Sequence, residues 1–278
     1  MDAGGTALVT GASRGIGRAV ALELAARGFD VVATMRDPKA GEGLAEQVAV
    51  GTGSLRAERL DVTDPDGFAM PSELRVLVNN AGVEAPHPSF ENTPLSIWRT
   101  MFETNVFGLI EVTRRAIPSL RAAGGSVLCN VTSSSLFAPV PFYAPYRASK
   151  AAVSVLGESL RTELAPFDIR VLEVMPGPID TEMLEGSDRP AHAVDEPDYA
   201  PMALRMYEGR KGKVADFVTP TAEAARRIVD AILDDDMPLR VGCDPLSIGM
   251  LDSWRASSDE DLMRPMVAAW VFDADAAT

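Results

Sequence analysis

Residues 6–28 read "TALVTGASRGIGRAVALELAARG", an apolar run followed by a glycine-rich turn and an amphipathic run closed by Gly28. The pattern predicts a strand over residues 6–10 and a helix over residues 15–28. Glycines at positions 11, 15 and 17 let the chain turn tightly and bring the helix N-terminus close to a phosphate. The spacing G-x-x-x-G-x-G differs from the G-x-G-x-x-G dinucleotide fingerprint. The strand before the turn and the helix after it nevertheless favour a phosphate-binding turn over a merely tight connection.

The alternation of short apolar runs and helical stretches continues almost to the end of the chain. Further strands are predicted at 30–35, 54–60, 74–80, 125–133, 169–176 and 238–242, and further helices at 94–120, 146–164 and 221–235. This order predicts an α/β fold of the Rossmann-like, doubly wound type, with a mostly parallel sheet of about seven strands and helices on both faces. We expect one domain over residues 1–278.

Three segments depart from this alternation. Residues 62–78 leave room for barely two helical turns, so one face of the sheet is expected to be less covered. Residues 180–216 carry prolines among acidic and small residues and show no strand pattern. The tail over residues 243–278 contains an amphipathic stretch, "DLMRPMVAAWVF", that predicts a helix.

Composition narrows the classes of function. The net charge of −14 argues against nucleic acid or an anionic membrane surface as a partner. The chain shows no signal-peptide pattern and no apolar run near the roughly 20 residues of a membrane span, so we expect a cytoplasmic protein. Cys129 and Cys243 lie in apolar runs and are expected to be small buried thiols. His87 and His192 lie in Pro-rich loops without the spaced partners of a metal site, so no metal is expected.

The stretch "YAPYRASK" over residues 143–150 offers two tyrosines for chemistry. Tyr146 and Lys150 share a helix face, whereas Tyr143 has Arg147 at the same spacing. A free phenol has a pKa of about 10, and a nearby cation lowers it. Because such a pair also arises by chance, these residues alone do not decide whether either tyrosine is catalytic.

Several motifs in order resemble the short-chain dehydrogenase/reductase family over about residues 4–242: the glycine turn, "NNAG" at 79–82, and Tyr146-x-x-x-Lys150. "LDVTD" (60–64) resembles the family segment that reads the adenine ring through an aspartate, and "PGPIDT" (176–181) the segment that holds the nicotinamide amide. "VVATMRDP" and "VPFYAPYRASK" are locally similar to hydroxysteroid and retinol dehydrogenases. The resemblance implies a cofactor site formed by Gly11, Ser13, Arg14, Gly15, Ile16, Gly17, Arg36, Asp61, Val62, Asn80, Ala81, Gly82, Tyr146, Lys150, Pro176, Gly177, Ile179 and Thr181.

The same resemblance implies a catalytic set of Asn105, Ser133, Tyr146 and Lys150. The family serine usually lies thirteen positions before the tyrosine, which selects Ser133 and keeps Ser134 as an alternative. Tyr146 would donate or accept the proton, and Ser133 would hydrogen-bond the substrate oxygen. Lys150 would bind the nicotinamide ribose and lower the Tyr146 pKa, while Tyr143 would line the substrate cleft.

Asn105 lies in a stripe that is otherwise apolar, and a buried asparagine must find hydrogen-bond partners. The family role is to hold a water in a proton relay, and a structural hydrogen bond to a neighbouring strand is the alternative. The apolar members of the stripe are Ile97, Met101, Leu109 and Val112.

Two arginines favour NADP over NAD as the cofactor. Arg14 lies in the glycine turn and Arg36 directly follows the strand that ends at Met35. In the family, basic residues at these positions meet the 2′-phosphate. Asp37 fits the spacing of a ribose-binding acid, but it lies two residues beyond the strand end.

The resemblance therefore implies an NADP(H)-dependent carbonyl reductase or alcohol dehydrogenase acting on a small-molecule carbonyl or alcohol. Residues 180–216 occupy the place of the family's substrate loop, and their methionines and leucines indicate a lipophilic substrate. Alternatives are a cofactor-sensing regulatory protein of the same fold and a sugar-nucleotide epimerase, whose chains are usually longer and carry a different glycine turn. In the family, helices corresponding to 94–120 and 146–164 form a subunit interface, which predicts a homodimer or homotetramer.

Overall fold

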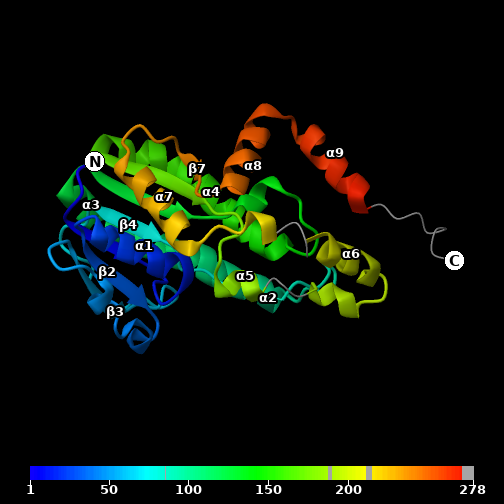
Figure 1. Ribbon diagram of the computed structural model, residues 1–278, viewed down its shortest axis with the longest axis horizontal. Coiled ribbons are helices and arrows are strands. Elements are labelled where there is room, and N and C mark those ends of the chain that lie inside the picture. Colours follow the sequence, from blue (N-terminus) through cyan, green and yellow to red (C-terminus); the bar gives the residue numbers. More distant parts are fainter. Residues whose placement is uncertain (85, 187–189, 211–214, 271–278) are drawn as a thin grey trace.

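A seven-stranded sheet with the order β3-β2-β1-β4-β5-β6-β7 organises the chain (Figure 1). The computed structural model describes residues 1–84, 86–186, 190–210 and 215–270. Every neighbouring pair of strands is parallel, and the order reverses between β1 and β4, which confirms the predicted doubly wound fold. The strands are β1 (Thr6–Val9), β2 (Asp30–Met35), β3 (Ser54–Arg59), β4 (Val76–Asn79), β5 (Ser126–Val131), β6 (Ile169–Met175) and β7 (Arg240–Gly242).

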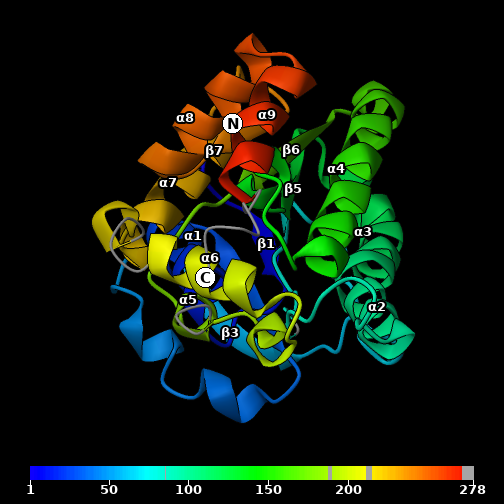
Figure 2. The same ribbon diagram turned by 90° about the vertical axis from the view of Figure 1, so that its right-hand side faces the viewer.

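Helices cover both faces of the sheet, because its central strands are apolar on both sides. Val9 and Val31 pack into one apolar cluster, whereas their neighbours Leu8 and Val32 pack into the other. Figure 2 shows α1 and α7 on the first face and α3 and α4 on the opposite face. These helices are α1 (Gly15–Ala26), α7 (Thr221–Leu233), α3 (Leu109–Ala123) and α4 (Ala144–Leu164).

The predicted helix over residues 94–120 is a helical run whose hydrogen-bond register changes in the middle. It comprises α2 (Leu95–Phe102), a π-helical segment (Glu103–Gly108) and α3. Asn105 lies in the π-helical segment and is buried, together with Met101, Leu109 and Val112 of the predicted stripe. Segments of π-helix insert an extra residue and frequently mark functional sites.

Residues 62–75, which have room for barely two helical turns, contain no helix. Pro65 and Pro71 remove backbone donors, and Gly67 adopts a φ of 87°, which together prevent a regular helix. Phe68 and Met70 from this loop instead pack against the Leu8 cluster. Apolar side chains of the loop therefore take over part of the cover that a helix would provide.

The two remaining irregular segments contain helices. Within 180–216 the structure has α5 (Glu182–Gly186) and α6 (Ala200–Arg210), and residues 187–189 and 211–214 lie outside the described ranges. The tail forms α8 (Pro245–Ala256), which was not predicted, and α9 (Asp259–Trp270), which confirms the amphipathic helix. Residues 271–278 lie outside the described part. Short 3₁₀ turns occupy Pro38–Gly41, Ala45–Gln47, Ser134–Phe137, Ala165–Phe167, His192–Asp195 and Ala215–Phe217.

Within the described ranges, no helix combines the length and the apolar composition needed to cross a membrane.

Candidate active site

The glycine turn after β1 is fastened to the "NNAG" segment after β4. The side-chain amide of Asn80 donates to the carbonyls of Thr10 and Gly11 at 3.0 and 3.1 Å, and the Ala81 amide donates to the Thr10 hydroxyl at 3.0 Å. A Cβ added at Gly17 would lie 2.3 Å from the Asn80 amide nitrogen. One at Gly11, where φ is 66°, would lie 2.7 Å from the Ala81 Cα. The two motifs therefore form one rigid wall, which only glycine at these positions allows.

A cleft of about 590 Å³ opens beyond the carboxyl ends of β1 and β4. Of the predicted site residues, Gly17 and Asn105 lie behind its wall and do not line it. The others line the cleft: Gly11, Ser13, Arg14, Gly15, Ile16, Arg36, Asp61, Val62, Asn80, Ala81, Gly82, Ser133, Tyr146, Lys150, Pro176, Gly177, Ile179 and Thr181. One continuous surface thus joins the glycine turn to the tyrosine, so an extended dinucleotide fits the residues present.

Tyr146 and Lys150 are buried side by side in the first turns of α4. The Lys150 ammonium nitrogen lies 5.8 Å from the centre of the Tyr146 ring and donates to the Val131 carbonyl at 2.9 Å. Burial lowers the Lys150 pKa to about 8, although the negative charges of Glu173 and Glu84 act to raise it. The lysine is therefore a desolvated cation whose charge depends on nearby carboxylates.

The pKa of Tyr146 is raised, and the expectation that the protein lowers it is wrong. Burial is the largest cause, and the negative charge of Glu84 adds to it. A side-chain hydrogen bond with Ser133 acts in the opposite direction but is weaker. The protein groups alone therefore hold Tyr146 as a neutral phenol, the form that can donate a proton.

Ser133 and Ser134, the two candidates for the catalytic serine, have different surroundings in the structure. The Ser133 side chain lies close enough to Tyr146 to act on the pKa of its phenol, whereas Ser134 is buried and its backbone amide donates to the Pro176 carbonyl at 2.9 Å. The Ser133 hydroxyl also accepts a hydrogen bond from the Ser135 amide, which caps the short 3₁₀ turn after β5. This geometry agrees with the spacing that selected Ser133.

Asn105 uses its whole side chain to connect three segments. Its amide oxygen accepts from the Val83 amide at 2.8 Å, and its nitrogen donates to the Val83 carbonyl and to the Ser149 hydroxyl, both at 3.0 Å. The partners are therefore the segment after β4 and the helix α4 rather than a neighbouring strand. Asn105 holds the "NNAG" segment at a fixed distance from the helix that carries Tyr146.

Tyr143 lies on the open side of the cleft, as predicted, and belongs to a group that sequence reasoning missed. Its ring stacks on His87 with 3.8 Å between ring centres, and His87 Nε2 lies 2.8 Å from a carboxylate oxygen of Glu84. Arg147, four residues after Tyr143, donates to the Ser135 carbonyl at 2.7 Å. A histidine in a Pro-rich loop carries no spacing signal, so tertiary contacts were needed to find this group.

The other end of the cleft carries the two arginines. Arg36 is close enough to Asp61 for its charge to act on that carboxyl: burial acts to raise the Asp61 pKa, but hydrogen bonds from Thr63 and the charges of Arg36 and Arg59 lower it overall. Asp37 accepts from the Lys39 amide at 3.1 Å and caps a 3₁₀ turn, so its carboxylate is engaged away from the cleft.

Arg14 forms an exposed ion pair with Glu182, which was not expected. Surface ion pairs of this kind are weak, so the guanidinium is able to exchange this carboxylate for a phosphate.

The tail completes the cleft. Asp244 is fully buried, caps α8 and accepts from the Gly177 amide at 2.7 Å. A Cβ on Gly177 would lie 2.5 Å from the Asp244 carboxylate. From α8, Leu246 and Met250 line the open side of the cleft. The tail is therefore part of the site, a role that its sequence did not indicate.

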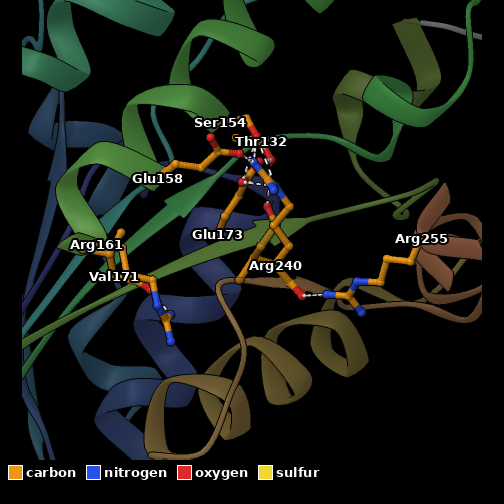
Figure 3. A network of polar contacts seen from close by, with 9 residues as sticks. Thr132, Ser154, Glu158, Arg161, Val171, Glu173, Arg240 and Arg255 are labelled. Atoms are coloured by element: carbon orange, nitrogen blue, oxygen red, sulfur yellow. Dashed lines mark hydrogen bonds and ion pairs between the residues drawn. The ribbon is translucent and has the colours of Figure 1, made fainter. Parts of the chain in front are cut away.

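A buried ionic network centres on Glu173 (Figure 3). Glu173 on β6 accepts from the Thr132 hydroxyl at 2.8 Å, from Ser154 at 2.9 Å and from Arg240 at 3.0 Å. Arg240 also pairs with Glu158, at the outer edge of the network. Figure 3 shows these side chains converging on Glu173 from β5, α4 and β7. The network fixes the residue next to Ser133 and the helix of Tyr146 relative to the sheet.

Comparisons with known proteins agree with this architecture. The family model of the short chain dehydrogenases matches residues 5–191. The uncharacterized oxidoreductase YusZ of Bacillus subtilis is 40% identical over 186 residues, which cover 64% of this chain and 66% of that protein. A sulfoacetaldehyde reductase of Chromohalobacter salexigens is 37% identical over 63% of this chain and 72% of that protein.

Solved structures resemble the chain over nearly its whole length. A short-chain dehydrogenase from Streptomyces avermitilis has a TM-score of 0.75 at 29% identity, covering 96% of this chain and 98% of that one. Another, from Burkholderia cenocepacia in complex with NADP, has a TM-score of 0.72 at 25% identity, covering 96% and 99%. The chain belongs to the short-chain dehydrogenase family and is an oxidoreductase of that family.

Proposed function

We propose that the chain is an NADP(H)-dependent oxidoreductase that transfers hydride between the nicotinamide and a carbonyl or secondary alcohol. The observation that carries the proposal is the meeting of Ser133, Tyr146 and Lys150 in one cleft with the glycine turn. The cofactor supplies the hydride and the positive charge of its oxidised ring. Arg14, Arg36 and Asp61 would hold its adenosine end, and Lys150 its nicotinamide ribose.

In the direction of reduction, Tyr146 donates its phenolic proton to the substrate oxygen as negative charge develops there. Ser133 stabilises the same oxygen by a hydrogen bond. The raised pKa of Tyr146 keeps the proton in place until the carbonyl needs it, and its buried position excludes water. Lys150, held by the Val131 carbonyl, stands ready to stabilise the phenolate that the step leaves behind.

The proposed preference for NADP over NAD rests on two observations: two arginines line the cleft, and the acid that could bind the ribose of NAD, Asp37, is engaged elsewhere. Arg14 and Arg36 line the cleft, whereas the Asp37 carboxylate is engaged by the Lys39 amide. Two relatives support the same choice: an NADPH-dependent 1-acyldihydroxyacetone phosphate reductase of Schizosaccharomyces pombe, 32% identical, and the NADP complex from Burkholderia cenocepacia. Arg14→Ala with Arg36→Ala should narrow the gap between NADPH and NADH affinity, measured by calorimetric titration. Tighter binding of NADH by the unmodified protein would contradict the assignment.

A lipophilic substrate is supported by the open side of the cleft. Val140, Met183, Leu184, Leu246 and Met250 line it. Among the relatives, estradiol 17-beta-dehydrogenase 2 of Rattus norvegicus is 35% identical and is named for a steroid.

The deciding experiment follows NADPH absorbance against a panel of ketones, aldehydes and alcohols. Tyr146→Phe should abolish turnover while NADPH still binds, because only the proton donor is removed, whereas Tyr143→Phe should keep most activity. Equal losses in the two variants would sink the assignment of the tyrosine. Binding of NADPH without turnover of any compound would favour the cofactor-sensing alternative.

The proposal includes a cytoplasmic homodimer or homotetramer. A face of α4 and the preceding helices leaves Phe107, Ile110 and Val155 exposed, by 55%, 37% and 60%. Two buried free thiols suit a reducing compartment. Light scattering should give at least twice the chain mass, and Val155→Arg should weaken assembly.

A further inference from the structure

The open side of the cleft contains an unusual charge. Its lining is mainly apolar, with Val140, Met183, Leu184 and Leu246 among the residues that face it. The other charged residues of the lining within the described ranges belong to the cofactor end or to the catalytic pair: Arg14, Arg36, Asp61, Lys150 and Glu182. Glu84 alone, among the described residues, brings a formal charge into the part that the cofactor residues leave to a substrate.

The Glu84 carboxylate is mostly buried and has few partners. Its side chain is 17% exposed, and its hydrogen bond within the described residues is the one to His87 at 2.8 Å. A carboxylate has about four acceptor positions, and leaving them unfilled away from water is unfavourable. Glu84 therefore retains unused acceptor capacity in the lining of the cleft.

The position of Glu84 is fixed by contacts from a distant part of the chain. Its partner His87 is 12% exposed and stacks on Tyr143. The backbone amide of His87 donates to His192 Nδ1 at 3.3 Å, and its carbonyl accepts from the Ala193 amide at 3.1 Å. A side chain this constrained can present its oxygens to a ligand without further loss of rotamer freedom.

We infer that Glu84 is the specificity-determining residue of the substrate cleft and selects substrates that carry a hydrogen-bond donor, a hydroxyl or an ammonium group, on an otherwise apolar body. The inference rests on the proposed function, because it assigns the carbonyl or alcohol end of the substrate to Tyr146. A donor on the substrate fills the free acceptor positions of the carboxylate. A carboxylate, sulfonate or phosphate at the same place meets repulsion from Glu84, so anionic carbonyl compounds are excluded.

The test uses four ketones of similar size: para-methyl-, para-hydroxymethyl-, para-aminomethyl- and para-carboxyacetophenone. Each is titrated calorimetrically into the full chain with NADP present, where no reduction takes place, and each is then assayed for turnover with NADPH. The hydroxymethyl or aminomethyl ketone should bind at least about tenfold more tightly than the methyl ketone, as expected for a hydrogen bond to a charged group. The carboxy ketone should bind most weakly. The tighter-binding of the hydroxymethyl and aminomethyl ketones identifies the donor group that Glu84 prefers, a hydroxyl or an ammonium.

Variants separate the carboxylate from the shape of the cleft. Glu84→Gln keeps an acceptor and should lose the aminomethyl preference, while Glu84→Leu should lose both preferences. Glu103→Gln, which removes one exposed charge from the π-helical segment, should keep the full pattern. Equal affinities for the methyl, hydroxymethyl and aminomethyl ketones in the unmodified protein overturn the inference, as does an unchanged preference in Glu84→Leu. If no compound of the wider panel of ketones, aldehydes and alcohols is turned over, the proposed function fails, and the binding order of these four ketones still decides the role of Glu84.

Discussion

Two mostly buried carboxylates, Glu173 and Glu84, act on the charge of Lys150, and their surroundings differ. Glu173 is 1% exposed and accepts from three side chains, Arg240 among them. Glu84 is 17% exposed and has the single partner His87 among the described residues. A carboxylate surrounded by donors holds the fold together, whereas one with free acceptor positions beside a cleft is available to a ligand. Both charges nevertheless reach Lys150 and raise its pKa.

The largest difference between the two carboxylates should appear in the loss of stability when each is replaced by glutamine. Glu173→Gln removes the charge that compensates Arg240 and should lower the free energy of unfolding by about 3 kcal/mol, since breaking a buried pair leaves an unpaired charge. Glu84→Gln should lower it by about 1 kcal/mol or less, because it removes one partly satisfied group. Urea unfolding of both variants measures the contrast.

Glu158→Gln serves as the control for this measurement, because Glu158 is a half-exposed partner of the same arginine. Its effect should stay below about 1 kcal/mol. Equal losses for Glu173→Gln and Glu158→Gln would show that burial of the network does not matter.

A smaller effect concerns the pH dependence of stability. The folded pKa of Lys150 is about 8, below its ordinary value of about 10.4, so between these values the unfolded chain binds a proton that the folded chain does not. The contribution of Lys150 to stability should therefore rise with pH, by about 2 kcal/mol from pH 8 to pH 10. Unfolding of the unmodified protein and of Lys150→Met across this range isolates the contribution.

The two carboxylates give this prediction an internal test. Removing either negative charge lowers the Lys150 pKa further, so the rise of stability with pH should begin at lower pH in both Glu173→Gln and Glu84→Gln. The change should be larger in Glu173→Gln, because Glu173 has the larger effect on the Lys150 pKa. A rise that begins at the same pH in all three proteins contradicts the proposed coupling.

The smallest effect concerns Tyr146, the proposed proton donor. Glu84 raises the Tyr146 pKa, second to burial, whereas Glu173 is not among its causes. Oxidation of an alcohol needs the phenolate, so its rate should rise with pH. In Glu84→Gln the rise should shift to lower pH, and in Glu173→Gln it should stay in place. The measurement is the pH profile of kcat/KM for the secondary alcohol of para-methylacetophenone, which has no donor besides its reacting hydroxyl.

Short sequence patterns predicted much of the fold and many of the residues that line the cleft. The glycine turn, the "NNAG" segment and Tyr146-x-x-x-Lys150 are short segments whose chemistry is visible in neighbouring residues, and the cleft contains all three. The expectation about the Tyr146 pKa failed for another reason: the pKa moves upward because of burial, which is a property of the folded chain.

The sequence by itself determined the parallel sheet, the glycine turn after its first strand, and the tyrosine and lysine on one helix face, because each depends on spacing within a few residues. Only the tertiary structure decided that Glu173 is enclosed by donors, that Asp244 of the tail supports Gly177, and that Glu84 and His87 stand beside Tyr143 in the cleft. These contacts join segments tens of residues or more apart. Their energies depend on burial and on the distances between charges, which no local spacing encodes.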